Sequence, residues 1–289
     1  MAAFTFTLNL KKYIGYATIN KIKVKDKNMN EINKTLYIPL YGKSYVSKKG
    51  IILEDKKAEE IWEKVKFPLK NKSKSKWLAY YMGMRAKVFD NYALNGLDKE
   101  TVIIHLGCGL DSRNLRTSLK NKWYDVDFPE VIKERKMYYK ENDNYRMIAS
   151  DVRDKKWINE IKENKSAVIL MEGISMYLKE AELIELFINI SVHFEKIKVF
   201  MDAYTSFAAK ASKYKNPVNE VGVSEVFGID DPNALENEKI KYAAEWEITP
   251  DYLINELKGF EKALFKKLYG GNLAKKLYKL YEFKADDNA

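Results

Sequence analysis

The sequence predicts an α/β protein with a doubly wound, mostly parallel sheet. Apolar runs of strand length at 101–106, 123–127 and 167–171 are separated by segments with helical periodicity. The run at 167–171 is continuously apolar, which is typical of a strand buried on both faces. The glycine turn Gly107-Cys108-Gly109 directly follows the first run. Strand, glycine turn, helix and second strand are the first half of a nucleotide-binding βαβ unit.

The second strand of this unit ends in Asp127, eighteen residues after Gly109. A carboxylate there can accept hydrogen bonds from both hydroxyls of a ribose, and glycines let a ligand approach the backbone closely. The third glycine of the dinucleotide pattern is missing, because Arg113 and Asn114 occupy its region. Pyrophosphate needs that glycine-lined helix start. The pattern therefore favours S-adenosylmethionine over NAD, although a GxG turn also occurs in ordinary tight turns.

The amino-acid composition limits which kinds of site and partner the protein can have. The chain has 289 residues, 46% of them hydrophobic, which is enough for a sizeable core. A single cysteine allows no internal disulfide. With only two histidines beside it, we expect no Cys/His zinc site and no other metal site. The net charge of +10 permits nucleic-acid binding, but the lysines are spread along the chain as on solvated helix faces. We expect a cytoplasmic protein, a monomer or homodimer, without nucleic-acid or membrane partners.

Before the first strand, residues 1–34 are expected to be a peripheral extension and 35–98 a helical cap. Apolar residues at helical spacing predict helices at 54–66 and 77–95. The lysine-rich loop at 70–76 is expected to be a solvated surface loop. Arg85 lies mid-helix among apolar neighbours, and its position alone suggests a surface arginine lying along apolar groups.

The cofactor-binding core is expected to span 99–203, within a single domain of residues 35–289. Its remaining elements are predicted as helices at 129–140, 155–163 and 179–193 and strands at 145–149 and 197–203. The acid Glu172 follows the buried strand at 167–171, at the edge where open α/β sheets bind ligands.

The C-terminal part is expected to hold a lid and a closing unit. Residues 204–248 read as irregular, punctuated by glycine and Pro232, and are expected to form a lid or substrate region. A helix is predicted to begin at Thr249-Pro250, with Thr249 as its cap. Runs at 263–269 and 276–284, around Gly270-Gly271, are predicted to be an antiparallel pair of strands.

Three motifs resemble one family. They are HLGCGLDSR (105–113), WYDVDFPEVIKERK (123–136) and MEGISMYL (171–178), supported by TLYIPLYGKSYVS (35–47), SDVRD (150–154) and the helix around Arg85. They are similar to the leucine carboxyl methyltransferase family and its bacterial relatives, the polyketide-synthesis O-methyltransferases. The resemblance covers about residues 35–284. It implies a class I S-adenosylmethionine-dependent methyltransferase with a Rossmann-like sheet of seven strands, the last antiparallel, an N-terminal helical cap and a lid insertion.

The resemblance also implies roles for individual residues. The turn of Gly107 and Gly109 would lie along the amino-acid portion of the cofactor, and Asp127 would bind its ribose. Asp151 and Val152 would face the adenine. Glu172 would line the methionine side, where Arg85 would pair with the cofactor carboxylate. Tyr177 would lie near the substrate.

The function expected from this resemblance is O-methylation of a carboxyl or hydroxyl group of a small molecule, such as a polyketide-like metabolite. No residue pattern identifies a general base; His193 fits a structural or surface histidine better. Three alternatives stay open: methylation of a protein C-terminal carboxyl group, a non-catalytic cofactor-binding or scaffold protein, and an RNA-binding role suggested only by the basic charge.

Overall fold

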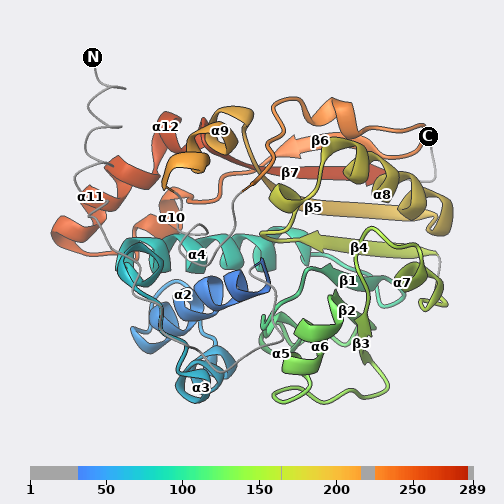
Figure 1. Cartoon of the computed structure of the whole chain (residues 1–289), viewed down its shortest axis with the longest axis horizontal. Coiled ribbons are helices and arrows are strands. Elements are labelled where there is room, and N and C mark those ends of the chain that lie inside the picture. The colour runs from blue at the N-terminus through green and yellow to red at the C-terminus, as the bar shows by residue number, and fades with distance from the viewer. Residues whose placement is uncertain (1–31, 164, 216–224, 286–289) are drawn as a thin grey trace.

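The protein is built on one seven-stranded sheet (Figure 1) in a computed structural model that describes residues 32–163, 165–215 and 225–285. The strand order is β3-β2-β1-β4-β5-β7-β6. Strand β7 is antiparallel to both of its neighbours, and the pairs from β3 to β5 are parallel. The strands are β1 (Val102–Leu106), β2 (Trp123–Asp127), β3 (Tyr145–Ala149), β4 (Ser166–Met171), β5 (Lys196–Tyr204), β6 (Lys241–Glu245) and β7 (Tyr278–Ala285).

Helices cover the sheet and form the cap. The α-helices are α2 (Tyr37–Lys48), α3 (Lys56–Val65), α4 (Lys76–Val88), α5 (Arg113–Arg116), α6 (Pro129–Arg135), α7 (Lys156–Asn159), α8 (Glu180–His193), α9 (Ser206–Lys215), α10 (Asp251–Ile254), α11 (Gly259–Tyr269) and α12 (Gly271–Lys275). The 3₁₀ helices are η1 (Ile32–Leu36), η2 (Asn71–Lys74), η4 (Ser175–Tyr177) and η6 (Pro232–Leu235). The π-helix η3 (Phe89–Ala93) extends α4.

Alternate residues of each buried strand enter different cores, because successive strand side chains point to opposite faces. In β1, Ile103 packs with residues of α2, α4 and α6, whereas Ile104 packs with residues of α7 and α8. Both faces are therefore covered, as in a doubly wound α/β fold. This explains why the strand at 167–171 reads as a continuous apolar run.

The cap helices reach the loops that follow the parallel strands. Helices α2 and α4 pack closely, since a Cβ on Gly83 would lie 2.7 Å from Val46 Cγ2. From this pair, Lys43 contacts Asp111 in the loop after β1, and Arg85 contacts Glu172 directly after β4. The cap therefore lies against the carboxyl-terminal edge of the sheet, where ligands bind in folds of this type.

The closing unit differs from the sequence prediction. The segment 263–269 belongs to helix α11, not to a strand. The partner of β7 is instead β6, inside the region 204–248 that was expected to be irregular and that also contains α9. A short apolar run does not distinguish strand from helix, and here Phe265 and Tyr269 stack at helical spacing, 5.0 Å between ring centroids.

The expected cap of the helix at 249 is also wrong. Helix α10 begins at Asp251, with Pro250 at the capping position. The Thr249 hydroxyl donates to the carbonyl of Tyr269 at 2.8 Å, so it ties this segment to the end of α11. Within the described ranges, no helix is both long and apolar enough to cross a membrane.

Candidate active site at the carboxyl edge of the sheet

The glycine turn after β1 adopts a backbone conformation that other residues rarely take. Gly107 and Gly109 have φ angles of +67° and +50°. A Cβ on Gly107 would lie 2.6 Å from Ile174 Cδ1, closer than side chains tolerate. Both the conformation and the packing therefore require glycine at position 107. The turn keeps its backbone uncovered by side chains of its own at these two positions.

Asp127, the last residue of β2, contacts this turn. Its Oδ2 accepts a hydrogen bond from the Gly109 N–H at 2.8 Å, and its Oδ1 accepts one from the Phe128 N–H at 2.8 Å. Burial raises the pKa of Asp127 to about 6, although these two N–H groups lower it. A carboxylate has about four acceptor positions, so two backbone donors leave it able to accept further hydrogen bonds.

Arg85 is buried, so the interpretation of a surface arginine is wrong. Its guanidinium lies among three side chains from other elements. Nε donates to Glu172 Oε1 at 3.1 Å, and Nη1 lies 3.1 Å from Asp202 Oδ2. Nη1 also donates to the Tyr278 hydroxyl at 3.3 Å. Nη2 makes no hydrogen bond to any residue in the described part of the chain, which leaves one edge of the guanidinium for another partner.

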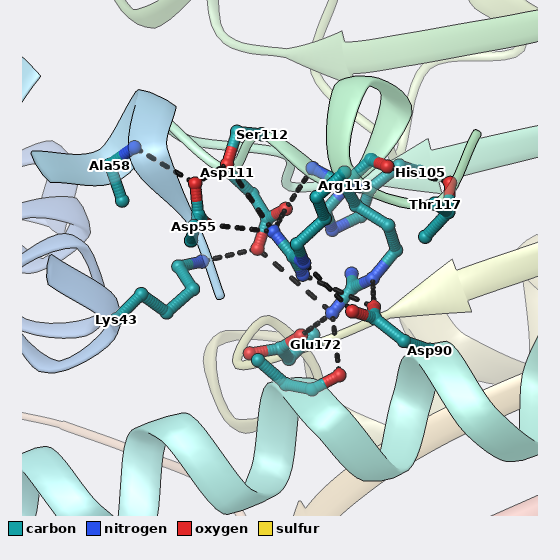
Figure 2. Close-up of polar contacts among 12 residues, drawn as sticks. Lys43, Asp55, Ala58, Asp90, His105, Asp111, Ser112, Arg113, Thr117 and Glu172 are labelled. Atoms are coloured by element: carbon teal, nitrogen blue, oxygen red, sulfur yellow. Dashed lines mark hydrogen bonds and ion pairs between the residues drawn. The ribbon is translucent and has the colours of Figure 1, made fainter. Parts of the chain in front are cut away.

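Glu172 is held by two arginines. Its Oε1 accepts from Arg85. Its Oε2 accepts from Nη2 of Arg113, the residue that replaces the third glycine of the dinucleotide pattern (Figure 2). Burial would raise the pKa of Glu172, but Arg113 and Arg85 lower it to about 2. Glu172 is therefore a permanent carboxylate whose two oxygens position both guanidinium groups. Arg113 also contacts Asp90 of η3.

These residues are part of a larger charge cluster that joins the cap to the core. Asp111 accepts from the N–H of Arg113, the first residue of α5, and it also pairs with Lys43 and Arg116. Every side chain in the cluster is at most 10% exposed. The cluster comprises the cations Lys43, Arg85, Arg113 and Arg116 and the acids Asp55, Asp90, Asp111, Glu172 and Asp202. With all groups ionised, four cations and five carboxylates carry one net negative charge.

The other predicted site residues lie around this edge. The loop after β3 is held beside Asp127, whose carbonyl accepts from the Ser150 N–H at 2.9 Å. In that loop, Asp151 is half-buried and paired with Arg153. Val152 is buried in the core on the α8 side, and its carbonyl accepts from the Trp157 indole at 3.0 Å.

Tyr177 lies in η4, which follows Glu172 by a few residues, and it is only partly buried. Its ring packs on a small cluster of Met176, Ala209 and Val226. Desolvation by burial raises the pKa of its hydroxyl, so the phenol is neutral.

The sequence interpretation missed the partners in the charge cluster. The sequence predicts Arg113 only as the residue in place of the third glycine, and it assigns no role to Asp202. Lys43 lies inside the TLYIPLYGKSYVS motif but was not singled out. A usable signal existed, because Asp202 and Glu172 are acids at the ends of adjacent parallel strands.

Metal binding has no support in the parts of the chain whose placement is described: no three His, Cys, Asp or Glu side chains there are arranged to hold an ion. The single cysteine, Cys108, is buried within the glycine turn, and burial raises the pKa of its thiol well above the ordinary value. A protonated buried thiol is a poor nucleophile and a poor metal ligand.

Comparisons with known proteins identify the fold and the family of this chain. The solved structure of a candidate methyltransferase from Thermobifida fusca YX shares the fold, with a TM-score of 0.54 at 13% identity, over 85% of this chain and 94% of that one. TcmP of Streptomyces glaucescens, a tetracenomycin polyketide synthesis O-methyltransferase, is 28% identical over 217 residues, 73% of this chain and 80% of its own length.

A second relative is the S-adenosylmethionine-dependent methyltransferase dpfgK of Gibberella zeae, 25% identical over 264 residues, 82% of this chain and 88% of its own length. The model of the leucine carboxyl methyltransferase family matches residues 29–191. The chain therefore belongs to the leucine carboxyl methyltransferase family and is an S-adenosylmethionine-dependent methyltransferase.

Proposed function

We propose that this enzyme is an O-methyltransferase that transfers the methyl group of S-adenosylmethionine to a carboxyl or hydroxyl oxygen of a small molecule. The hydrogen bond between the Gly109 N–H and Asp127 is the observation that carries the assignment of the cofactor site. It brings an acid with unused acceptor positions against a backbone turn that has no side chains at its two glycines.

The residues present fit the cofactor. Asp127 would accept hydrogen bonds from the ribose hydroxyls, and the turn of Gly107 and Gly109 would lie along the amino-acid portion. The unused Nη2 edge of Arg85 would pair with the cofactor carboxylate. Charge-assisted pairing of guanidinium with carboxylate is among the strongest polar contacts available to a protein.

The adenine end would rest on the loop after β3. Asp151 would meet the base at its polar edge. Val152 would contribute through its backbone N–H, since its side chain packs in the core and its carbonyl already accepts from Trp157. Glu172 would line the methionine side while it holds Arg85 in place.

The charge of the site favours a cationic ligand over a dinucleotide. The charge cluster carries one net negative charge, and S-adenosylmethionine carries a sulfonium, an ammonium and a carboxylate, which sum to one positive charge. At the start of α5, the Asp111 carboxylate already accepts from the Arg113 N–H, where a pyrophosphate would otherwise bind. A phosphate there would meet a buried carboxylate, which explains why the third glycine is not needed.

S-adenosylmethionine supplies an electrophilic methyl group on a sulfonium whose leaving group is a neutral thioether. The chain's own residues therefore need to hold the acceptor oxygen in line with that methyl group. Such positioning contributes at most about 7–11 kcal/mol to the lowering of the barrier. Tyr177, partly exposed in the turn after β4, is the residue we assign to the acceptor side.

A small-molecule acceptor is supported by the similarity to TcmP, which acts in polyketide synthesis. A second candidate is methylation of a C-terminal leucine carboxyl group in a protein, which the description of the matching family favours. Faster methylation of a peptide with a free C-terminal leucine than of the same peptide amide would support this second candidate.

Calorimetric titration of the purified protein with S-adenosylmethionine, S-adenosylhomocysteine and NAD tests the cofactor assignment. We expect the first two to bind and NAD not to bind. Asp127→Ala should abolish detectable binding, because the ribose hydroxyls lose their acceptor. Lys74→Ala is the control, since Lys74 is an exposed lysine of η2. Unchanged affinity in Asp127→Ala would refute the assignment.

A further inference from the structure

Four tyrosines from four elements surround the side of Arg85 that faces Asp202. Tyr278 is the first residue of β7 and lies opposite Tyr204, the last residue of β5. Their ring centroids are 4.8 Å apart in an edge-to-face arrangement, and Tyr81 of α4 meets Tyr278 edge-to-face at 6.1 Å. Tyr177 packs on the same small apolar cluster as Tyr204 and Tyr278. We call Tyr81, Tyr177, Tyr204 and Tyr278 the tyrosine cluster.

The four side chains of the tyrosine cluster are partly buried. All four residues keep part of their surface accessible. Burial nevertheless raises the pKa of Tyr81, Tyr177 and Tyr278, so their hydroxyls are neutral hydrogen-bonding groups. Aromatic rings that are partly accessible and carry neutral hydroxyls are well suited to bind a planar aromatic ligand edge-to-face or stacked.

Asp202 is buried behind these rings and has one oxygen in need of a donor. Its Oδ1 accepts from the Gly173 N–H at 2.7 Å. Its Oδ2 has no hydrogen-bond partner, although Arg85 Nη1 lies 3.1 Å away. The Tyr278 hydroxyl accepts from Arg85 and still has its own proton to donate, and its interaction with Asp202 lowers the pKa of that acid. Tyr278 thus lies between the accessible surface and the buried carboxylate.

Within residues 32–163, 165–212 and 225–285, the arginines nearest to the tyrosine cluster already have acidic partners. Arg85 is shared by Glu172 and Asp202, and Arg113 is shared by Glu172 and Asp90. The remaining edge of Arg85 is assigned to the cofactor carboxylate. Among these described side chains, a carboxylate acceptor would therefore meet the negative charge of Asp202 without a cation left to pair with it, whereas a neutral hydroxyl would meet a proton acceptor.

We propose that the tyrosine cluster is the acceptor site, that it takes a planar aromatic molecule bearing a hydroxyl group, and that Tyr278, backed by Asp202, receives the proton of that hydroxyl. This inference rests on the proposed O-methyltransferase function and selects the hydroxyl among its two acceptor classes. Tyr278 would be the catalytic residue, because it touches the substrate. Asp202 would act through it.

In the methyl transfer, one bond to the methyl carbon forms, one breaks and two protons move. The acceptor oxygen forms a bond to the methyl carbon, and the carbon–sulfur bond breaks with its electron pair passing to sulfur. The acceptor proton moves to the Tyr278 oxygen while the Tyr278 proton moves to the Asp202 carboxylate. Release of that proton to water resets the pair. A phenol, with a pKa of about 10 in water, benefits from such a base, which contributes typically about 10²–10⁴-fold.

Asp202 has a suitable environment for this task. Burial raises its pKa to about 6, opposed by Arg85, the Gly173 N–H and Tyr278 and assisted by the charge of Glu172. The other ionisable neighbours are Tyr81 and Tyr177, both neutral. A carboxylate whose pKa lies just below the working pH is mostly ionised and is an efficient proton acceptor.

The test uses 2-naphthol and 2-naphthoic acid, planar probes that differ in carrying a hydroxyl or a carboxyl group. Transfer of labelled methyl from S-adenosylmethionine is followed for each probe, and binding of S-adenosylhomocysteine is measured in parallel. We expect methylation of 2-naphthol and little or none of 2-naphthoic acid. Tyr278→Phe and Asp202→Asn should each lower the rate with 2-naphthol by about 10²-fold at pH 7.5 and saturating S-adenosylmethionine. Binding of S-adenosylhomocysteine should survive in both variants, although Asp202→Asn also removes a partner of Arg85.

The pH profile separates proton transfer from a structural role. The wild-type rate should rise to a plateau above pH 6, whereas the Asp202→Asn rate should keep rising toward the pKa of the phenol itself. Tyr124→Phe is the matched control, since the Tyr124 hydroxyl bonds Glu163 on the opposite face of the sheet. It should leave the rate unchanged.

The outcomes distinguish this inference from the proposed function. If S-adenosylhomocysteine binds but neither probe binds or is methylated, the aromatic acceptor site is refuted and the cofactor assignment stands. Preference for 2-naphthoic acid, or a Tyr278→Phe rate equal to wild type, overturns the role of Tyr278. If S-adenosylhomocysteine does not bind to the wild type, the proposed function itself fails.

Discussion

Asp127 is the residue whose protonation should control cofactor affinity. Its pKa is raised to about 6 from 3.8, because burial disfavours the carboxylate. Above pH 6 the carboxylate can accept from two ribose hydroxyls; below it, a protonated carboxyl loses acceptor capacity. We therefore expect the dissociation constant of S-adenosylhomocysteine to rise as pH falls from 7.5 to 5, approaching about tenfold per pH unit below pH 6. Calorimetry across this range measures the effect.

Asp127→Asn is the matched control for this pH dependence. The asparagine side chain has the same shape and keeps one acceptor oxygen, but it does not titrate. The affinity of this variant should be weaker than that of the wild type and should no longer change between pH 7.5 and 5 through this group. A wild-type affinity that stays constant over the same range would show that Asp127 does not hold the ribose.

The raised pKa of Asp127 also affects the stability of the fold. The contribution of this group to the stability of the folded state is largest below pH 3.8 and is lost as pH rises through 6. Such a raised carboxyl pKa is common for functional residues.

At the scale of secondary-structure elements, the strands of the parallel core were predicted within one or two residues. They are buried on both faces, so their sequences read as apolar runs. Helix α11 was mistaken for a strand, because the segment 263–269 is short and its apolar residues fit both periods. Strand β6 was missed for the opposite reason: its residues alternate between exposed and half-buried, and its sequence, KYAAE, has few strand-forming residues.

The site was predictable only where it is local in sequence. Gly109 and Asp127 belong to one βαβ unit, whose spacing specifies that they meet. Arg85 and Glu172 lie 87 positions apart, and their contact depends on how the cap packs on the sheet. Without that packing, Arg85 reads as a surface residue. The family resemblance implies a site role for Arg85, which stays a prediction, and it does not imply that two acids hold Arg85.

The glycine turn offers a test of how a single element sets the shape of the site. Gly107→Ala should lower the free energy of unfolding for two reasons. A residue with a Cβ costs about 1–2 kcal/mol in a left-handed conformation. In addition, the new Cβ would lie 2.6 Å from Ile174 Cδ1 and displace the turn after β4. We expect weaker S-adenosylhomocysteine binding together with a lower midpoint in urea unfolding.

Gly50→Ala separates the two contributions. Gly50 has φ of +66°, almost the same as Gly107, but a Cβ there would meet nothing within 4 Å. This variant should therefore show the conformational cost alone and bind the cofactor normally. Equal losses of stability in the two variants, with equal binding, would mean that the contact with Ile174 relaxes without consequence.

At the scale of the whole molecule, the charge cluster connects the cap to the sheet through buried ion pairs. Arg113 follows β1, yet it contacts Asp90 at the end of the α4 segment and Glu172 after β4 (Figure 2). A buried ion pair need not stabilise a fold more than apolar residues would, but removing one partner leaves the others buried and uncompensated. We therefore expect the cluster to favour one cap orientation, and with it the position of Arg85.

Arg113→Met tests this coupling. The substitution keeps an unbranched apolar chain but removes the cation that neutralises Glu172 and Asp90. We expect the free energy of unfolding to fall by about 3–5 kcal/mol, since charge partners remain buried. Because Arg85 then becomes the sole arginine contacting Glu172, S-adenosylhomocysteine binding should weaken as well. Urea unfolding and calorimetry on the same preparation measure both effects.

Lys64→Met is the matched control, since it removes a cation from an exposed pair. Lys64 contacts Glu60 on α3, and the two side chains are 60% and 42% exposed. A pair of this kind contributes at most about 1 kcal/mol, because water screens both charges. The variant should unfold nearly like wild type and bind the cofactor normally. If Arg113→Met were equally mild, the cap would be held by its apolar contacts alone, and the buried charges would serve the ligand without supporting the fold.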